Sequence, residues 1–321
     1  MAKVGIMIEG QEDLTWDRWH RIIDRVEALG FESLWRSDHL IPLVREDTSE
    51  ALEAWISFST LAARTSTIRF GPMVSPVTFR HPAVLAKMAA SIDRLSDGRL
   101  ELGLGAGWND REHAAFGVPY PPLSDRFEML EESIKLTRAL WTEDNVTFKG
   151  KHYHLDAVAC HPKPVQKPPP PIIVGGNGKR CTLPIAAAYA DEWNGTLQLP
   201  SSYRTRVEIL RAKCEEIGRD PANLRCSLMV PLLIGRSESE LGARLERIAG
   251  IMAKYPDMKK ATPASLAEQG WLSGMPSQVV EQMQHFEEAG VERFMLQLFD
   301  YDDLEVLDIV AQDAMPQVDR S

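Results

Sequence analysis

The chain has 321 residues and a formal net charge of −10 at pH 7, with 44% hydrophobic and 26% charged residues, as in an ordinary globular protein. This acidic balance argues against duplex nucleic acid and an anionic membrane surface as partners, because both require a basic binding face. No run approaches the roughly 20 apolar residues of a membrane-spanning helix, and the N-terminus shows no secretory pattern, so we expect a cytoplasmic protein.

Short β-rich runs alternate with amphipathic runs along the first half of the chain. In the first helix Trp19, Ile22, Ile23 and Val26 follow i, i+3, i+4 spacing, and Gly30 is a plausible C-cap. The predicted strands are 4–8, 31–35, 68–74 and 99–104, and the predicted helices are 16–29, 52–63, 82–95 and 126–141.

The middle of the chain departs from this alternation. Residues 147–153 predict a small β-hairpin that turns at Lys149 and Gly150. The proline-dense run 162–171 excludes a helix and favours a stiff, extended connector over a peptide ligand for an SH3-type domain.

The alternation then resumes to the end of the chain. The predicted strands are 172–174, 192–197, 224–234 and 293–298, and the predicted helices are 183–189, 203–217, 238–252, 278–289 and 304–311. The stretch 254–274 is polar and is expected to be irregular. Eight strands, each followed by a helix, predict one domain over 1–321 with an α/β fold, a (β/α)8 TIM barrel with short insertions. A doubly wound sheet is the alternative.

Cysteine and histidine patterns do not indicate a metal site. The four cysteines lie far apart, at Cys160, Cys181, Cys214 and Cys226. They form no Cys-x-x-Cys pair, which favours buried thiols over a disulfide framework or a zinc site. His152 and His154 are close, but no partner repeats at ligand spacing. We therefore expect no bound metal.

If the fold is a barrel, the active site lies at the C-terminal ends of the strands. Asp38 and His39 follow the second strand, and a carboxylate beside an imidazole can orient the ring and set its proton. The alternative is that Asp38 caps a loop and His39 packs on the rim. Residues 71–76 read Gly-Pro-Met-Val-Ser-Pro, which suits a bulge pressed against a flat ligand or a simple strand end.

Two glycine-rich segments follow later strands. Residues 103–109 match a dinucleotide-binding loop weakly, because the third glycine falls one residue early and no acidic residue follows at ribose spacing. We interpret these glycines as room for a planar ring, with Trp108 and Asn109 facing the pocket. In 175–180 three glycines, two basic residues and a helix start predict a phosphate site rather than a plain connector.

Several of these segments are familiar together from one family. They are Asp38-His39, Arg80–Ala83, Ser96–Arg99, Gly105–His113, Gly175–Gly178 and Ala190–Asn194. With them the chain, from Val4 to about Leu298, resembles the luciferase-like monooxygenase superfamily and, within it, the coenzyme F420 (deazaflavin)-dependent oxidoreductases. The resemblance implies a bacterial luciferase-like TIM barrel, usually a homodimer, that transfers hydride between deazaflavin and an unidentified small-molecule substrate.

The resemblance also implies roles for particular residues. His39 would be the catalytic proton-handling residue, with Asp38 holding it or bonding the cofactor ring. A non-prolyl cis peptide at Pro72–Met73 would back the ring, and residues 175–178 would bind the cofactor phosphate. The implied cofactor-binding residues are Asp38, Pro72, Met73, Gly107, Trp108, Asn109, Gly175, Gly176, Asn177 and Gly178.

The chain departs from the sugar-phosphate dehydrogenases of this group at Trp108, where they have a catalytic glutamate. This argues against sugar-phosphate or simple alcohol oxidation by that mechanism. Two alternatives remain: an FMN-dependent monooxygenase on the same fold, and a non-catalytic flavin- or deazaflavin-binding protein. Lys259, Lys260 and Arg293 are candidates for the acidic tail of the deazaflavin cofactor, although solvated surface charge is the commoner role for such residues.

Overall fold

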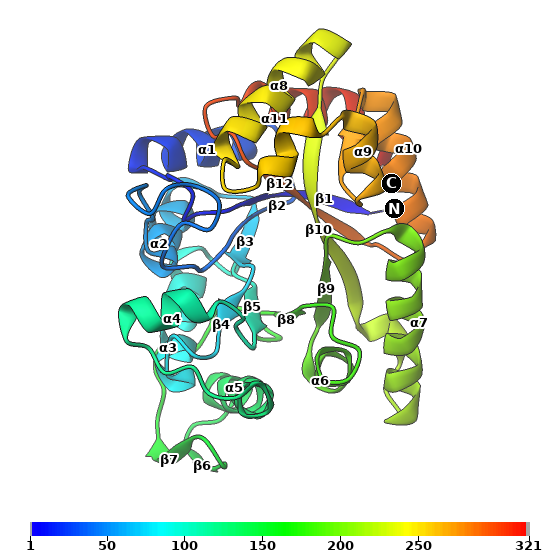
Figure 1. Cartoon of the computed structure of the whole chain (residues 1–321). Coiled ribbons are helices and arrows are strands. Elements are labelled where there is room, and N and C mark those ends of the chain that lie inside the picture. The colour runs from blue at the N-terminus through cyan, green and yellow to red at the C-terminus, as the bar shows by residue number, and fades with distance from the viewer. Residues whose placement is uncertain (1, 319–321) are drawn as a thin grey trace.

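The computed structural model describes residues 2–318 of the chain. Strands and helices alternate, and Figure 1 shows the helices on the outside of the strands. The strands are β1 (Lys3–Ile8), β2 (Ser33–Arg36), β3 (Arg69–Pro72), β4 (Ser75–Pro76), β5 (Leu102–Gly105), β6 (Val146–Lys149), β7 (His154–Val158), β8 (Ile172–Gly175), β9 (Glu192–Thr196), β10 (Arg225–Ile234), β11 (Leu272–Gly274) and β12 (Arg293–Leu298). The helices are α1 (Trp16–Ala28), α2 (Ala54–Arg64), α3 (Pro82–Leu95), α4 (Asp110–Phe116), α5 (Leu123–Thr142), α6 (Thr182–Tyr189), α7 (Pro200–Glu216), η1 (Pro221–Asn223), α8 (Glu238–Ile251), η2 (Pro256–Lys260), α9 (Pro263–Glu268), α10 (Pro276–Glu288), α11 (Glu305–Ile309), η3 (Val310–Ala314) and α12 (Met315–Val318).

The strand order around the barrel is β3-β2-β1-β12-β10-β9-β8-β5-β4, with β11 beside β10. β3 pairs with β2 and β4 pairs with β5, in parallel, and these two short segments follow one another in the chain. They form one position of the barrel, so the ring closes through them. This confirms the predicted (β/α)8 barrel in place of a doubly wound sheet.

The inside of the barrel is packed with side chains. Met7, Trp35, Ile173 and Met295 form one layer there and are fully buried, and Met73 lies against them at 6% exposure. The opposite faces of the strands pack on the apolar stripes of the helices, such as Trp19, Ile22, Ile23 and Val26 of α1. A filled barrel of this kind leaves room for a ligand beyond the strand ends.

Local signals set the helix ends. The Thr15 side chain accepts a hydrogen bond from the Arg18 amide at the start of α1, and Gly30, with a φ of +74°, follows its end. Pro82 opens α3, which has the predicted bounds 82–95, because proline suits a first helical position where no amide donor is needed.

Two parts of the element prediction are wrong. The stretch 254–274 is not irregular: it contains η2, α9 and β11. Prolines open both short helices, and Thr262 with Ser265 forms a capping box on α9. Helix α4 was also not predicted, although Asn109 caps it and Gly117, at a φ of +66°, ends it. These segments are too short for hydrophobic periodicity to identify them.

Other predictions of the middle segment are confirmed. β6 and β7 form the expected antiparallel hairpin, but its turn is longer than predicted, over 150–153, so its second strand begins only at His154. The hairpin projects beside α5 in Figure 1. The proline-dense run 162–171 contains no helix or strand. The four cysteines are free thiols, and Cys160, Cys214 and Cys226 are buried as predicted, whereas Cys181 is exposed at the start of α6.

A buried ion cluster fills the N-terminal end of the barrel. Arg293, the first residue of β12, is 1% exposed and donates to Glu32, Glu101 and Glu192. Glu192 opens β9 and Glu101 immediately precedes β5. The cluster therefore lies at the end of the strands opposite to the one where a barrel places its ligand.

Candidate active site

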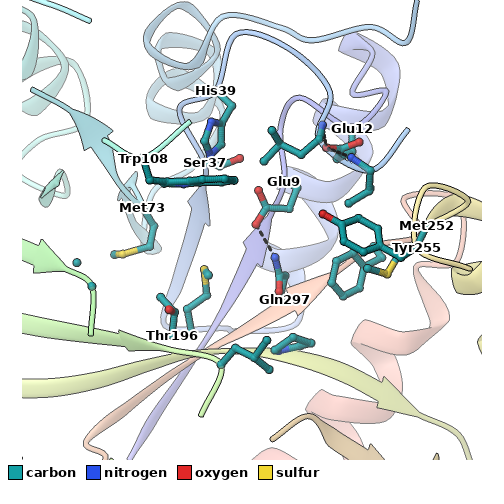
Figure 2. Close-up of a pocket in the computed structure, with 18 of the residues that line it drawn as sticks. Glu9, Glu12, Ser37, His39, Met73, Trp108, Thr196, Met252, Tyr255 and Gln297 are labelled. Atoms are coloured by element: carbon teal, nitrogen blue, oxygen red, sulfur yellow. Dashed lines mark hydrogen bonds between the residues drawn. The ribbon is translucent and has the colours of Figure 1, made fainter. Parts of the chain in front are cut away.

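A cavity of about 1120 Å³ lies at the C-terminal ends of the strands (Figure 2). It is lined by Glu9 after β1, His39 after β2 and Gln297 near the end of β12, and by the loops after β5, β8 and β9. On one side it reaches the glycines 175–178, and on the other the segment 252–271 that follows α8. The position agrees with the rule for barrels of this class.

His39 is held by a buried carboxylate. Its Nδ1 lies 2.9 and 3.1 Å from the two oxygens of Glu112, which also accepts from the Leu40 amide at 3.1 Å. Burial lowers the pKa of His39, but the hydrogen bond and charge of Glu112, with the charges of Glu9 and Asp38, outweigh it, so the pKa of His39 lies above its ordinary value. Trp108 meets His39 edge-on, with 5.6 Å between ring centroids (Figure 2).

Asp38 does not contact His39 through its carboxylate. It is 2% exposed, accepts from Arg80 at 2.6 and 3.1 Å and from the Ser75 hydroxyl at 2.6 Å, and does not line the cavity. Consecutive residues in an extended segment point to opposite sides, so when His39 faces the cavity Asp38 faces the barrel wall. Glu112 of α4 thus takes the place predicted for Asp38, and Asp38 anchors the loop through Arg80.

The barrel position shared by β3 and β4 is interrupted beside the cavity. The non-prolyl peptide in the cis form joins Met73 to Val74, one residue later than predicted, because the Met73 amide still bonds to Arg36 of β2 at 2.9 Å. Met73 and Val74 line the cavity, whereas Pro72 does not. Pro72 instead stays in register with Arg36 in the sheet.

The glycines of β5 make room for protein rather than directly for a ligand. A Cβ on Gly103 would lie 2.0 Å from the Pro72 carbonyl oxygen, and a Cβ on Gly105 would lie 2.6 Å from a methyl group of Val74. A Cβ on Gly175 would meet Val74 at 2.8 Å. These glycines therefore let the 73–74 backbone sit deep in the barrel wall, which corrects the interpretation that they clear space for a ring.

The segment after β5 places only part of the predicted set in the cavity. Gly107, with a φ of +76°, and Trp108, 67% exposed, line it. Asn109 does not: its side chain accepts from the Arg111 amide at 3.2 Å as the cap of α4, and it is 6% exposed. Asn109 therefore orients the helix that carries Glu112.

The glycine loop after β8 reaches the cavity through its backbone. Gly175, Gly176, Gly178 and Thr182, the first residue of α6, line it. Asn177 points away from the cavity and links two loops, because it donates to the Thr196 carbonyl at 2.8 Å and accepts from the Thr196 amide at 3.1 Å. The basic side chains predicted to assist, Lys179 and Arg180, are exposed and do not line the cavity.

Sequence reasoning missed three side chains of this site. Glu9 accepts from Gln297 and, at 2.9 Å, from Gln11 (Figure 2). Glu12 is 2% exposed and accepts from the amides of residues 43–45, so it holds the loop after β2. Glu9 directly follows β1, so the rule that active-site residues follow strands could have identified it. Glu112 could not be identified in this way, because its place in the site depends on where α4 packs.

Two predictions about other charged groups need correction. Arg293 is buried in the ion cluster at the other end of the barrel and is not available to an acidic cofactor tail. Asp125, Glu128 and His152 bring candidate ligand atoms within 4.8 Å of one another, although the sequence indicated no partner for His152. The Lys151 ammonium already lies 2.6 Å from Glu128 there, and the carboxylates come from α5, about two dozen residues earlier.

Within residues 2–318, no helix combines the length and apolarity needed to cross a membrane.

Comparisons with known proteins agree with this architecture. A family model described as luciferase-like monooxygenase matches residues 2–293. The F420-dependent glucose-6-phosphate dehydrogenase of Amycolatopsis mediterranei is 40% identical over 52% of this chain and 48% of its own, so the chain spans about half the length of this relative. The enzyme of the same name from Nakamurella multipartita is 28% identical over 91% of this chain and 89% of its own. The solved structure of an F420-dependent secondary alcohol dehydrogenase with an F420–acetone adduct superposes with a TM-score of 0.84 at 22% identity, covering 99% of both chains.

Proposed function

Since the chain belongs to the luciferase-like monooxygenase family, we propose that it is an oxidoreductase that uses coenzyme F420 to transfer hydride to or from a small organic molecule. Relatives named as F420-dependent dehydrogenases support this proposal. The observation that carries it is that one cavity joins a histidine–carboxylate pair to a glycine-rich helix start. The first supplies a proton-transfer group, and the second supplies backbone donors for a phosphate.

The residues present fit such a cofactor. Met73 and Val74 offer a backbone wall for a flat ring, and Trp108 lines the same cavity (Figure 2). Gly176, at a φ of +123°, and Gly178 bring main chain close to the cavity at the start of α6, where a phosphate would bind. Coenzyme F420 supplies hydride chemistry when bound, and the protein supplies orientation, exclusion of water and protons.

We propose His39 as the proton-handling residue. Glu112 occupies its Nδ1, which leaves Nε2 for a ligand in the cavity. Because the pKa of His39 is raised, the imidazolium persists to a higher pH than an ordinary histidine would allow, and Nε2–H can donate to an oxygen that gains negative charge. Asp38 contributes by fixing Arg80 and the loop rather than by contact with the ligand.

Fluorescence titration of the purified protein with F420 and with FMN tests the cofactor. F420 should bind in the micromolar range or tighter and FMN at least tenfold more weakly. Gly176→Val should weaken F420 binding at least tenfold, because a branched side chain is strained at that φ, whereas Gly242→Val in an open position of α8 should not. Tight binding of FMN without binding of F420 would instead support the FMN-dependent monooxygenase. Binding of F420 without turnover on any substrate would support the non-catalytic binding protein.

Further expectations belong to the same proposal. Ile56 of α2 and Val84 of α3 are large apolar side chains, 61% and 54% exposed, on neighbouring helices, and we propose that they take part in a homodimer interface. Light scattering after gel filtration would measure the mass. A single domain over 1–321 and a cytoplasmic location stay predictions.

A further inference from the structure

The cavity continues well past the part that would hold the cofactor. Away from the glycines of 175–178, it extends under the chain that follows α8. Exposed charged residues of 254–260 line its outer part, and six apolar or aromatic residues line it further: Met252, Tyr255, Met258, Ala261, Trp271 and Phe299. We name these six residues the apolar annex.

The apolar annex is built on a rigid base. Trp271 and Phe299 stack with 5.4 Å between ring centroids and are 6% and 7% exposed. Both belong to a buried cluster with Leu233, Leu241 and Leu266, and Met252, Met258 and Ala261 pack on it from the cavity side. A flat aromatic base with flexible methionines above it suits an apolar ligand of variable shape.

A carboxylate stands where the apolar annex meets the rest of the cavity. Glu9 is partly buried and accepts one hydrogen bond at each oxygen, from Gln297 and Gln11, so each oxygen keeps acceptor capacity. Figure 2 shows Glu9 pointing into the open centre, with the Tyr255 hydroxyl turned toward the same space. The other two carboxylates have partners within the protein: Glu12 accepts from main-chain amides, and Glu112 is hydrogen-bonded to His39.

The charges near the apolar annex disfavour an anionic group at its inner end. Glu9 would repel one there. Of the two lysines in this part of the lining, Lys254 is paired with Asp47 at 3.0 Å, and Lys260 is exposed in η2, the short helix that also carries Asp257. A neutral hydroxyl can instead donate to Glu9, and a neutral carbonyl can accept from Tyr255 or from His39. The apolar lining and the charge of Glu9 thus both favour a neutral ligand with a hydroxyl or carbonyl group.

Resting on the F420-dependent function proposed above, we propose that the substrate is a neutral, elongated, mainly apolar alcohol or ketone. Its alkyl body lies in the apolar annex, and its oxygen lies between Glu9 and His39. This differs from the phosphorylated sugar named for the dehydrogenases to which the chain is similar, because Glu9 would repel a phosphate at the inner end and the six side chains of the apolar annex offer a sugar no charged partner.

Calorimetric titration of the full chain tests this with four probes: 2-octanol, 2-octanone, octanoate and glucose 6-phosphate. The two neutral probes should bind at least tenfold more tightly than octanoate, and glucose 6-phosphate should not bind measurably. Glu9→Gln removes the charge but keeps an acceptor oxygen, so it should narrow the gap between octanol and octanoate to threefold or less. Equal affinities of the two in the unchanged protein would overturn the proposal.

Substitutions in the apolar annex locate the binding. Met258→Asp should weaken octanol and octanone at least tenfold, and Ala261→Trp should do the same by filling the space. Met275→Asp is the matched control, because Met275 is an exposed methionine, 38% accessible, outside the cavity lining, and octanol affinity should stay within twofold. If Met258→Asp and Ala261→Trp both bind octanol as tightly as the unchanged protein does, the alkyl body does not lie in the apolar annex.

F420 titration of the same proteins separates the two proposals. Both annex variants should retain F420 affinity within threefold, because the annex lies away from the 175–178 loop. F420 binding without octanol or octanone binding overturns the substrate class alone. If the unchanged protein does not bind F420, the proposed function is overturned, whether or not octanol and octanone bind.

Discussion

The pair of His39 and Glu112 shows how one buried contact can set a protonation state. Glu112 is 1% exposed, and its carboxylate faces both the His39 ring nitrogen and the Leu40 amide. Burial alone would favour the neutral imidazole, but the nearby carboxylate reverses this preference. The imidazolium of His39 therefore persists to a higher pH than that of an ordinary histidine, and a protein without Glu112 would lose this shift.

Glu112→Gln should lower the pKa of His39, because the amide keeps a hydrogen bond but removes the charge that opposes burial. The sign for stability follows: a raised histidine pKa stabilises the folded state below the unfolded value of about 6.5, and this contribution is lost as pH rises through the folded value. The variant should therefore be less stable than the unchanged protein mainly at acidic pH. If the protein reduces a ketone as proposed, this activity should also disappear at a lower pH in the variant.

The measurement is an NMR titration of the histidine ring protons, combined with the pH profile of kcat. Glu128→Gln is the matched control, because Glu128 bonds to His152 at 2.8 Å on the surface and does not line the cavity. It should leave the titration of His39 unchanged. An unshifted His39 midpoint in Glu112→Gln would show that Glu112 does not set its charge.

At the scale of elements, the segment 73–74 depends on glycines in neighbouring strands. Gly103 and Gly105 of β5 and Gly175 of β8 have no side chains, and the backbone and the Val74 methyl groups occupy the space where Cβ atoms would be. The wall of the proposed cofactor site is thus made by close approach of main chains. An added methyl group in the sheet should displace this wall.

Gly103→Ala should destabilise the protein by about 2–3 kcal/mol and weaken F420 binding, because its Cβ would overlap the Pro72 carbonyl, which is backbone and cannot move freely. Gly242→Ala in α8 has nothing within 4 Å of its Cβ and should stabilise by roughly 0.5–1 kcal/mol. Urea unfolding measures both free energies. Equal stability of Gly103→Ala and the unchanged protein would refute the close-approach argument.

These contacts also explain how far the sequence could predict the site. The strand–helix alternation predicts the barrel, and the barrel places His39 and the 175–178 glycines at one end, as found. It does not predict partners that come from distant elements, such as Glu112 on His39 or Arg80 on Asp38. Nor does it separate Trp108, which faces the cavity, from Asn109, which caps a helix, because adjacent residues in a loop have no fixed period.

At the scale of the whole molecule, the two ends of the barrel have different chemistry. The C-terminal end carries the cavity, and the N-terminal end carries Arg293 among Glu32, Glu101 and Glu192. Burial raises the pKa of Glu101, but Arg293 and Arg69 outweigh it and lower the pKa of Glu101 to about 2. For Glu192, burial dominates and the pKa is raised. Arg293 thus links strands β5, β9 and β12 through charges that have no access to water.

Arg293→Met should destabilise the protein by about 3–5 kcal/mol at pH 7, because it removes the buried cation that Glu101 and Glu192 share and leaves each with one partly exposed arginine, Arg69 or Arg225. Glu101 contributes stability above its unfolded pKa of about 4.3, and this contribution is lost as pH falls toward its folded value of about 2. In the variant the pKa of Glu101 should rise, so that the carboxyl group becomes neutral in mild acid. The difference in unfolding free energy between the two proteins should therefore shrink from pH 7 to pH 5.

Urea unfolding at both pH values measures this difference. Arg225→Met is the control: Arg225 reaches the same Glu192 at 3.3 Å from a side chain that is 46% exposed, and its loss should cost ~1 kcal/mol or less. Arg293→Met/Glu101→Gln should recover part of the lost stability, because it removes one of the two buried carboxylate charges that have lost Arg293. If Arg293→Met costs no more than Arg225→Met, or costs the same at pH 5 as at pH 7, the buried charges do not hold this end of the barrel together.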